Sequence, residues 1–115
     1  MKVYSTYDGG DVPELNVVRE GVITRIFFDY AVEEKEMEGE AVDVLTCENV
    51  DVRGIDYGSI VNAIVRDRYP QDRVEAILAN GSDTEAHAEE LAAFQAWRVK
   101  AKAVAAAVIS VIEQA

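Results

Sequence analysis

The C-terminal segment from Ser82 onward constrains the fold more than any other part of the sequence. It contains no Gly or Pro, and it includes an almost wholly apolar run over residues 103–112. Gly and Pro are the residues that most often interrupt a helix, whereas alanine, which is abundant here, is the strongest helix former. The segment is therefore predicted to form one long helix over residues 83–113. Ser82 and Glu85 have the spacing of a capping box at its start.

Large apolar residues in this helix recur at alternating steps of three and four, which is the pattern of a buried helix face. This face and its neighbours comprise Phe94, Trp97, Ala101, Val104, Val108, Ile109, Val111 and Ile112. A helix over residues 83–113 is ~46 Å long, whereas a compact chain of this size is roughly 34 Å across. The most apolar turns should overhang the body of one chain. Either the helix bends back or a second copy covers these turns. We predict the second, in a homo-oligomer built on this helix.

Composition limits the kinds of protein and partner. Half of the 115 residues are hydrophobic, which is typical of a folded chain, and the length fits a single domain. The net charge of −11 argues against binding to nucleic acid or to anionic membrane surfaces. The apolar run is too short to span a bilayer. The N-terminus lacks the apolar core of a signal peptide, so we expect an intracellular location.

The first half of the chain reads as strands. Residues 3–7 and 15–19 are short candidates, and residues 22–33 alternate most clearly, with the even-numbered side chains on a core-like face. Residues 41–52 alternate again. The intervening residues 34–40, which are mostly charged, are predicted to be a polar loop. These runs predict an antiparallel β-hairpin or small meander.

The second half reads as helices. Apolar residues over 57–69 have helical spacing, with Asp56 or Ser59 as the N-cap, and Pro70 ends this helix near Arg68. A short helix follows, for which Asp72 and Glu75 resemble an N-cap pair. Strands followed by three helices, the last one long, predict an α+β fold. We expect one domain over residues 1–115, with a strand-rich half (1–54) and a helical half (55–115).

Part of the helical half resembles a known group of proteins. The matching pattern is Asp56-Tyr57-Gly58, Val61, Ala63-Ile64-Val65-Arg66, Tyr69, Asp72, Glu75-Ala76-Ile77, Asn80, Phe94-Gln95-Ala96-Trp97-Arg98 and Ala101-Lys102. With the preceding hairpin, it resembles small uncharacterised proteins encoded in prophages of gut anaerobes. The resemblance spans roughly residues 20–105. It implies a setting among phage genes, such as those for particle assembly, and hence a location in the cytoplasm of a host cell or in a virion. It transfers no functional residue because that family has no established activity.

Candidate chemistry is sparse. The only histidine, His87, lies on a polar helix face, and the only cysteine, Cys47, lies in a strand-like stretch. Neither has the neighbours of a catalytic or zinc site. No nucleophile–base pair, phosphate-binding loop or nucleotide fingerprint is visible, so we expect no enzyme, no cofactor and no metal.

Two classes of function remain open. The first is a non-catalytic structural or interaction protein, phage-associated by resemblance, that self-associates through the C-terminal helix and contacts other phage or host proteins. The alternative is an acidic inhibitor that imitates DNA and binds a host protein that handles nucleic acid. For the alternative, the acidic surface would consist of Glu33, Glu34, Glu36, Glu38 and Glu40. The spacing of alternate strand residues, about 6.8 Å, is roughly twice the phosphate rise of one DNA strand.

Overall fold

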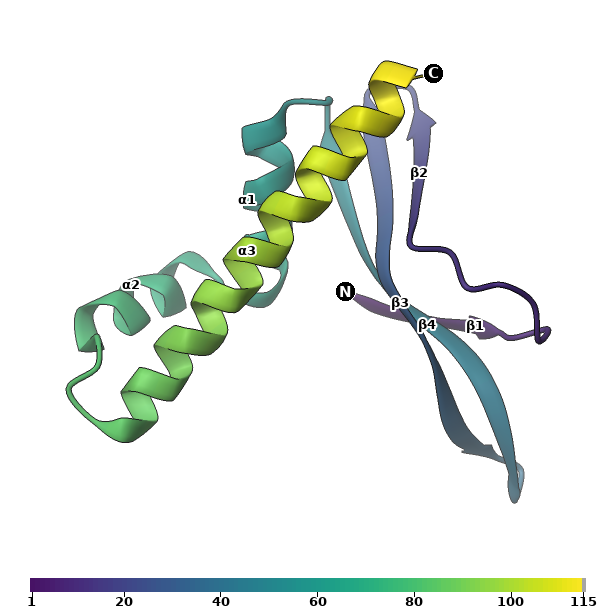
Figure 1. The fold of residues 1–115 in the computed structure, drawn as a ribbon, viewed down its shortest axis with the longest axis horizontal. Helices are drawn as coiled ribbons and strands as arrows, with labels where there is room; N and C mark the ends of the chain where they lie inside the picture. Colours follow the sequence, from purple (N-terminus) through teal and green to yellow (C-terminus); the bar gives the residue numbers. More distant parts are fainter. Residues whose placement is uncertain (115) are drawn as a thin grey trace. The chain divides into compact units, whose positions relative to one another are not determined.

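The fold is that of a computed structural model, and residues 1–114 are described (Figure 1). Four strands precede three helices, so the predicted α+β class is confirmed. The chain divides into two compact units, with the boundary between Arg53 and Gly54. The elements are β1 (Lys2–Thr6), β2 (Leu15–Glu20), β3 (Ile23–Met37), β4 (Glu40–Arg53), α1 (Tyr57–Arg68), α2 (Gln71–Asn80) and α3 (Glu85–Gln114).

The N-terminal unit is a four-stranded antiparallel sheet with strand order β1-β4-β3-β2. The long central strands β3 and β4 form a hairpin, and β1 and β2 flank only part of it. β1 pairs with residues 44–48 of β4, and β2 pairs with residues 23–28 of β3. Beyond them the hairpin continues as a two-stranded ribbon over residues 34–43, which we call the hairpin extension (Figure 1). It projects roughly 14 Å past the last β1 pair.

A β-bulge in β3 changes which side chains share a face. Phe28 lies opposite Glu48 but Ala31 lies opposite Thr46, so two residues of β3 face the single residue Cys47. Asp29, the first of the two, has φ +58°, a left-handed conformation that aspartate tolerates better than most residues. Thr24, Ile26 and Phe28 are buried on one face as predicted. The alternation predicted to continue through Tyr30 and Val32 is wrong, because the extra residue reverses it.

The predicted polar loop over residues 34–40 is also wrong. β3 runs to Met37 and β4 begins at Glu40, so only Glu38 and Gly39 form the turn. Both have positive φ, 52° and 84°, as a two-residue type I′ turn requires. Charged side chains are compatible with this ribbon because both of its faces can be solvated, and charge on an exposed strand limits edge-to-edge aggregation. Residues 34–40 are therefore the ends of two strands and the tight turn that joins them.

The first two helices begin in different ways. Asp56 caps α1, because its carboxylate accepts from the Ser59 backbone N–H at 3.0 Å, and α1 ends at Arg68 as predicted. α2 begins after Pro70 and has no side-chain cap. The predicted N-cap pair at Asp72 and Glu75 is wrong, because both residues lie inside the helix and Pro70 already sets its start.

The long helix α3 spans 30 residues, and its cap lies two residues later than predicted. The Thr84 hydroxyl accepts from the His87 backbone N–H at 3.1 Å, and the Thr84 carbonyl accepts from Ala88. The capping box at Ser82 and Glu85 is therefore wrong. Both serine and threonine are suitable caps, so sequence spacing alone could not decide between them.

The helical unit is built around α3, which packs against α1 and α2. Ile60 and Ile64 of α1 and Ile77 of α2 are buried together with one face of α3. Trp97 fixes the α1–α3 contact, since its indole Nε1 donates to the Ile64 carbonyl at 3.0 Å. These contacts determine which face of α3 is left exposed.

Candidate functional site

The eight α3 residues predicted to form an oligomer interface are not equally accessible. Phe94, Trp97, Ala101 and Val108 are buried within a single chain. They therefore do not lie on a surface that a second copy could reach. Val104, Ile109 and Ile112 are half-buried, and Val111 is 44% exposed.

The apolar end of α3 is covered at Val108 within a single chain. Val108 is 0% exposed, so the expectation that one chain leaves the apolar end of α3 uncovered is wrong at this position. That expectation assumed one compact body of roughly spherical shape. The chain instead divides into two compact units, so a diameter calculated for one compact body does not apply.

An exposed face of α3 is a better candidate interface. Six exposed residues recur at steps of four, three, four, three and four, and we call them the outer face of α3: Ala92, Ala96, Val99, Ala103, Ala106 and Ser110. Val99, in the middle of this row, is 67% exposed, the highest value among the large apolar side chains of residues 1–114. The five steps average 3.6 residues, which is the repeat of a straight α-helix, so the row stays on one side of α3 along its length.

The chemistry of the outer face suits contact with another helix. The five residues other than Val99 are four alanines and one serine. Small side chains allow two helix axes to approach closely. Lys100 and Lys102 flank the row and are also exposed. Sequence reasoning missed Val99 because it lies outside the stripe of large residues. The signal was available, since Val99 is the one large apolar residue in a row that otherwise holds only small side chains.

The opposite face of α3 is held firmly in place. Phe94 meets the Tyr69 ring edge to face, with ring centroids 5.1 Å apart. The guanidinium of Arg68 lies 3.6 Å from the centroid of the Trp97 ring and stacks on the indole. The indole N–H donates at the same time to the Ile64 carbonyl of α1. Aromatic and cation–π contacts of this kind define the rotation of a helix about its axis. The outer face is therefore presented in a fixed orientation relative to α1.

The start of α3 carries a local ion pair. His87 Nδ1 contacts the Asp83 carboxylate one turn earlier. The hydrogen bond from His87 lowers the pKa of Asp83 below its ordinary value. Both side chains are exposed to solvent in part, and the pair stabilises the first turn of a helix.

The acidic residues proposed as a DNA-like surface do not share one face. Glu34 lies opposite Asp43 and shares its side of the ribbon with Glu36, whereas Glu33 lies on the other side. Lys2 forms an ion pair with Glu33 at 2.6 Å. Two further carboxylates complete the set: Glu38 is in the turn, and Glu40 faces the same side as Glu33. Only one face of the extension therefore presents several carboxylates together.

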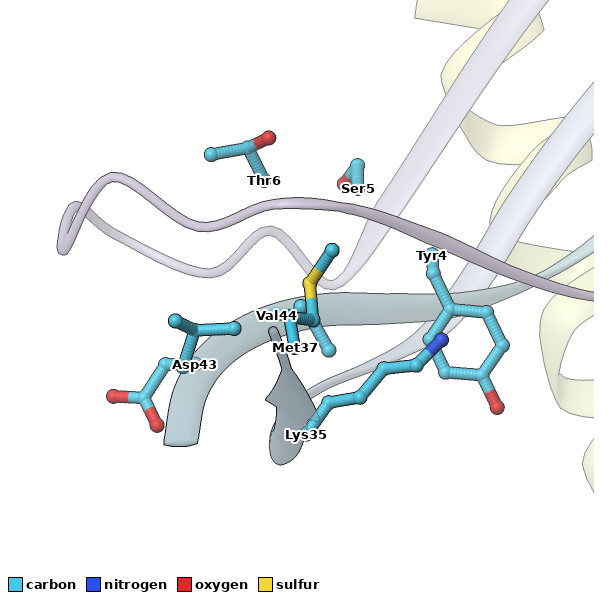
Figure 2. Close-up of a pocket in the computed structure, with 8 residues that line it drawn as sticks. Tyr4, Ser5, Thr6, Lys35, Met37, Asp43 and Val44 are labelled. Carbon is cyan, nitrogen blue, oxygen red and sulfur yellow. The ribbon is translucent and has the colours of Figure 1, made fainter. Parts of the chain in front are cut away.

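A shallow groove lies on the side of the sheet that carries Glu33. It has a volume of about 410 Å³ and is lined by residues of β1, β3 and β4: Tyr4, Ser5, Thr6, Lys35, Met37, Val42, Asp43 and Val44 (Figure 2). The Lys35 ammonium lies 4.7 Å from the centroid of the Tyr4 ring, and Lys2 lies 5.6 Å from it. The lining combines apolar side chains with one ammonium (Lys35), one carboxylate (Asp43) and the hydroxyls of Ser5 and Thr6.

Cys47 is buried opposite the bulge in β3. Burial raises the pKa of its thiol, and burial likewise raises the pKa of the neighbouring Tyr30 phenol. A raised pKa keeps the thiol protonated near neutral pH, and the thiolate is the reactive form. Cys47 therefore has the properties of a small core residue, and the two groups hydrogen-bond to each other.

Residues 1–114 contain no group of three or more His, Cys, Asp or Glu side chains placed to hold a metal ion. None of the helices in that range is both long enough and apolar enough to span a membrane. Comparisons of the chain with protein-family models, with curated proteins and with solved structures find no match.

Proposed function

We propose that this protein is a non-catalytic structural or interaction protein that self-associates through the outer face of α3. The supporting observation is the exposure of Val99, 67%, within a row of small side chains that lie on one side of α3. The resemblance to prophage-encoded proteins supports a setting in which such a protein contributes to phage assembly.

The energetics of the contact follow from Val99. Full burial of a valine side chain is worth roughly 1.5 kcal/mol or more, so two copies together gain about 3 kcal/mol from this residue. That corresponds to about a hundredfold in dissociation constant. The alanines contribute mainly by allowing this close approach, and association of moderate strength is expected.

The test compares two variants of α3 that introduce the same charge. Val99→Asp places a carboxylate in the proposed contact, whereas Ala86→Asp places one at another exposed position of the same helix. Light scattering across a concentration series should show that Val99→Asp weakens association by about a hundredfold or more. Ala86→Asp should behave as the unmodified protein. Equal behaviour of the two variants would refute the proposed interface.

A second candidate is an acidic inhibitor of a host protein that handles nucleic acid. One observation favours it: Glu34 and Asp43 are placed directly opposite each other on adjacent strands, and Glu36 lies on the same face. Like charges in this arrangement destabilise a sheet, so their presence on one face is consistent with a role in binding a cationic surface. Neutral variants at the three positions, Glu34→Gln, Glu36→Gln and Asp43→Asn, test the idea together.

The assay measures retention of DNA-binding proteins from host lysate on the immobilised protein. The inhibitor proposal predicts retention that added duplex DNA competes away, that high salt abolishes, and that the triple variant lacks. Retention that DNA does not displace, or that the triple variant keeps, would eliminate this candidate.

A further inference from the structure

The helical unit contains a groove bounded by all three of its helices. Its volume is about 330 Å³, and its lining consists of Val61, Asn62, Val65, Arg66, Gln71, Val74, Leu78, Phe94 and Arg98. Residues from α1, α2 and α3 all contribute, so the groove exists only when the helices are packed as they are in Figure 1. It lies apart from Val99, which is not among its lining residues.

The floor and walls of the groove are apolar. Phe94 is buried at its base, and Val61, Val65 and Val74 are half-buried along its sides. Leu78 of α2 stands at the rim and is 54% exposed. An exposed leucine beside three half-buried valines forms an apolar surface, and covering it with a partner would be favourable in free energy.

The charge of the groove is opposite to that of the protein as a whole. The chain carries a net charge of −11, yet the charged residues in the lining are Arg66 and Arg98, with no carboxylate among them. Arg66 lies in the last turn of α1. Arg98 Nη1 donates to the Gln95 side-chain oxygen at 2.8 Å, a neutral partner that leaves the guanidinium positively charged. Two guanidiniums beside an apolar floor match a ligand with carboxylates beside apolar groups.

The exposed leucine at the rim favours a protein segment over a small molecule. A groove formed by three helices with an exposed leucine at its rim has the form of helix-in-groove recognition, in which apolar side chains at positions i, i+3 and i+4 enter the groove. Carboxylates on the flanks of such a helix would then face Arg66 and Arg98. A small anionic amphiphile would fill the floor but would leave Leu78 uncovered.

We propose that this groove binds an acidic amphipathic helix of a partner protein, with its apolar side chains against Phe94 and Leu78 and its carboxylates on Arg66 and Arg98. This site is separate from the outer face of α3 and does not depend on self-association. It assigns to the protein a second contact surface, for a partner of defined chemistry.

The probe is a synthetic amphipathic peptide whose leucines repeat every three or four residues, with glutamates flanking them. Control peptides replace each glutamate with glutamine or with lysine. Binding to the full-length protein is followed by amide shifts in two-dimensional NMR spectra and by fluorescence polarisation. The glutamate peptide should shift amides of Val61, Val65 and Leu78 in a saturable manner. The glutamine peptide should bind at least about tenfold more weakly, and the lysine peptide should not bind.

Matched protein variants complete the experiment. Arg66→Gln with Arg98→Gln should lower affinity for the glutamate peptide about tenfold, whereas Lys100→Gln with Lys102→Gln, which changes the net charge equally, should leave it unchanged. The comparison of peptides on the unmodified protein stands even if a variant folds poorly. Equal binding of the glutamate and lysine peptides, shifts centred on Val99, or saturation of the groove by octanoate with the affinity of the peptide would each overturn the proposal.

Discussion

Replacing Trp97 with phenylalanine tests the contact that orients α3. The substitution removes the indole N–H that donates to the Ile64 carbonyl, and it removes ring atoms from a side chain that is only 5% exposed. In an α-helix that carbonyl also accepts from the backbone N–H four residues later, so it keeps a donor when the indole is removed. Loss of the indole hydrogen bond therefore costs only about 0.5–1 kcal/mol. Loss of two buried carbons costs about 1.6 kcal/mol more. The expected destabilisation is about 2 kcal/mol.

The assay is thermal unfolding followed by circular dichroism at a helix-sensitive wavelength, because the variant lacks the only tryptophan. A loss of about 2 kcal/mol should lower Tm by about 8–16 °C for a unit of this size. Arg68→Gln, which removes the cation over the ring but keeps the indole, serves as the control and should cost under about 1 kcal/mol. An unchanged Tm for Trp97→Phe would mean that Trp97 does not fill the α1–α3 contact.

Two further predictions concern the cap of α3 and the hairpin extension. Thr84→Ala should lower stability in urea unfolding by about 1 kcal/mol, whereas Ser82→Ala should have little effect; the reverse order would restore the capping box at Ser82. Glu34→Lys should raise stability by about 0.5 kcal/mol, because it turns a repulsive cross-strand pair with Asp43 into an attractive one in exposed surroundings. Glu36→Lys, opposite Ala41, makes the same charge change and should gain less; equal gains would show a general effect of net charge.

The order and type of the elements could be predicted from local pattern. Alternation over residues 22–33 and 41–52 marked the central hairpin, and helical spacing marked α1 and α3. These signals are strong because each depends only on the period with which side chains return to a buried face. The stop at Pro70 was equally clear, since proline restricts the residue before it.

The errors occurred where two local conformations were compatible with the same residues. A bulge at Asp29 requires a left-handed residue that is usually glycine, and nothing nearby signalled it. The charged residues of the hairpin extension resembled a loop because a strand was expected to have a buried apolar face. A two-stranded ribbon that is solvated on both faces does not need one. Thr84 and Ser82 could both cap a helix, and only the packed structure selects Thr84.

The candidate surfaces were harder to predict than the fold. Periodicity identified which α3 residues are apolar, but burial of Val108 and exposure of Val99 depend on how the chain packs. The groove beside Arg66 and Arg98 joins residues that are 32 positions apart in sequence and belong to different helices. A property assembled from three helices has no local sequence signature.

Sedimentation equilibrium of the unmodified protein, from micromolar to millimolar concentration, tests the central claim most directly. If the outer face of α3 mediates self-association, the weight-average mass should rise with concentration to at least twice the mass of one chain, and Val99→Asp should abolish the rise. A mass that stays at one chain throughout this range would contradict self-association. A rise that Val99→Asp leaves intact would place the contact elsewhere on the protein.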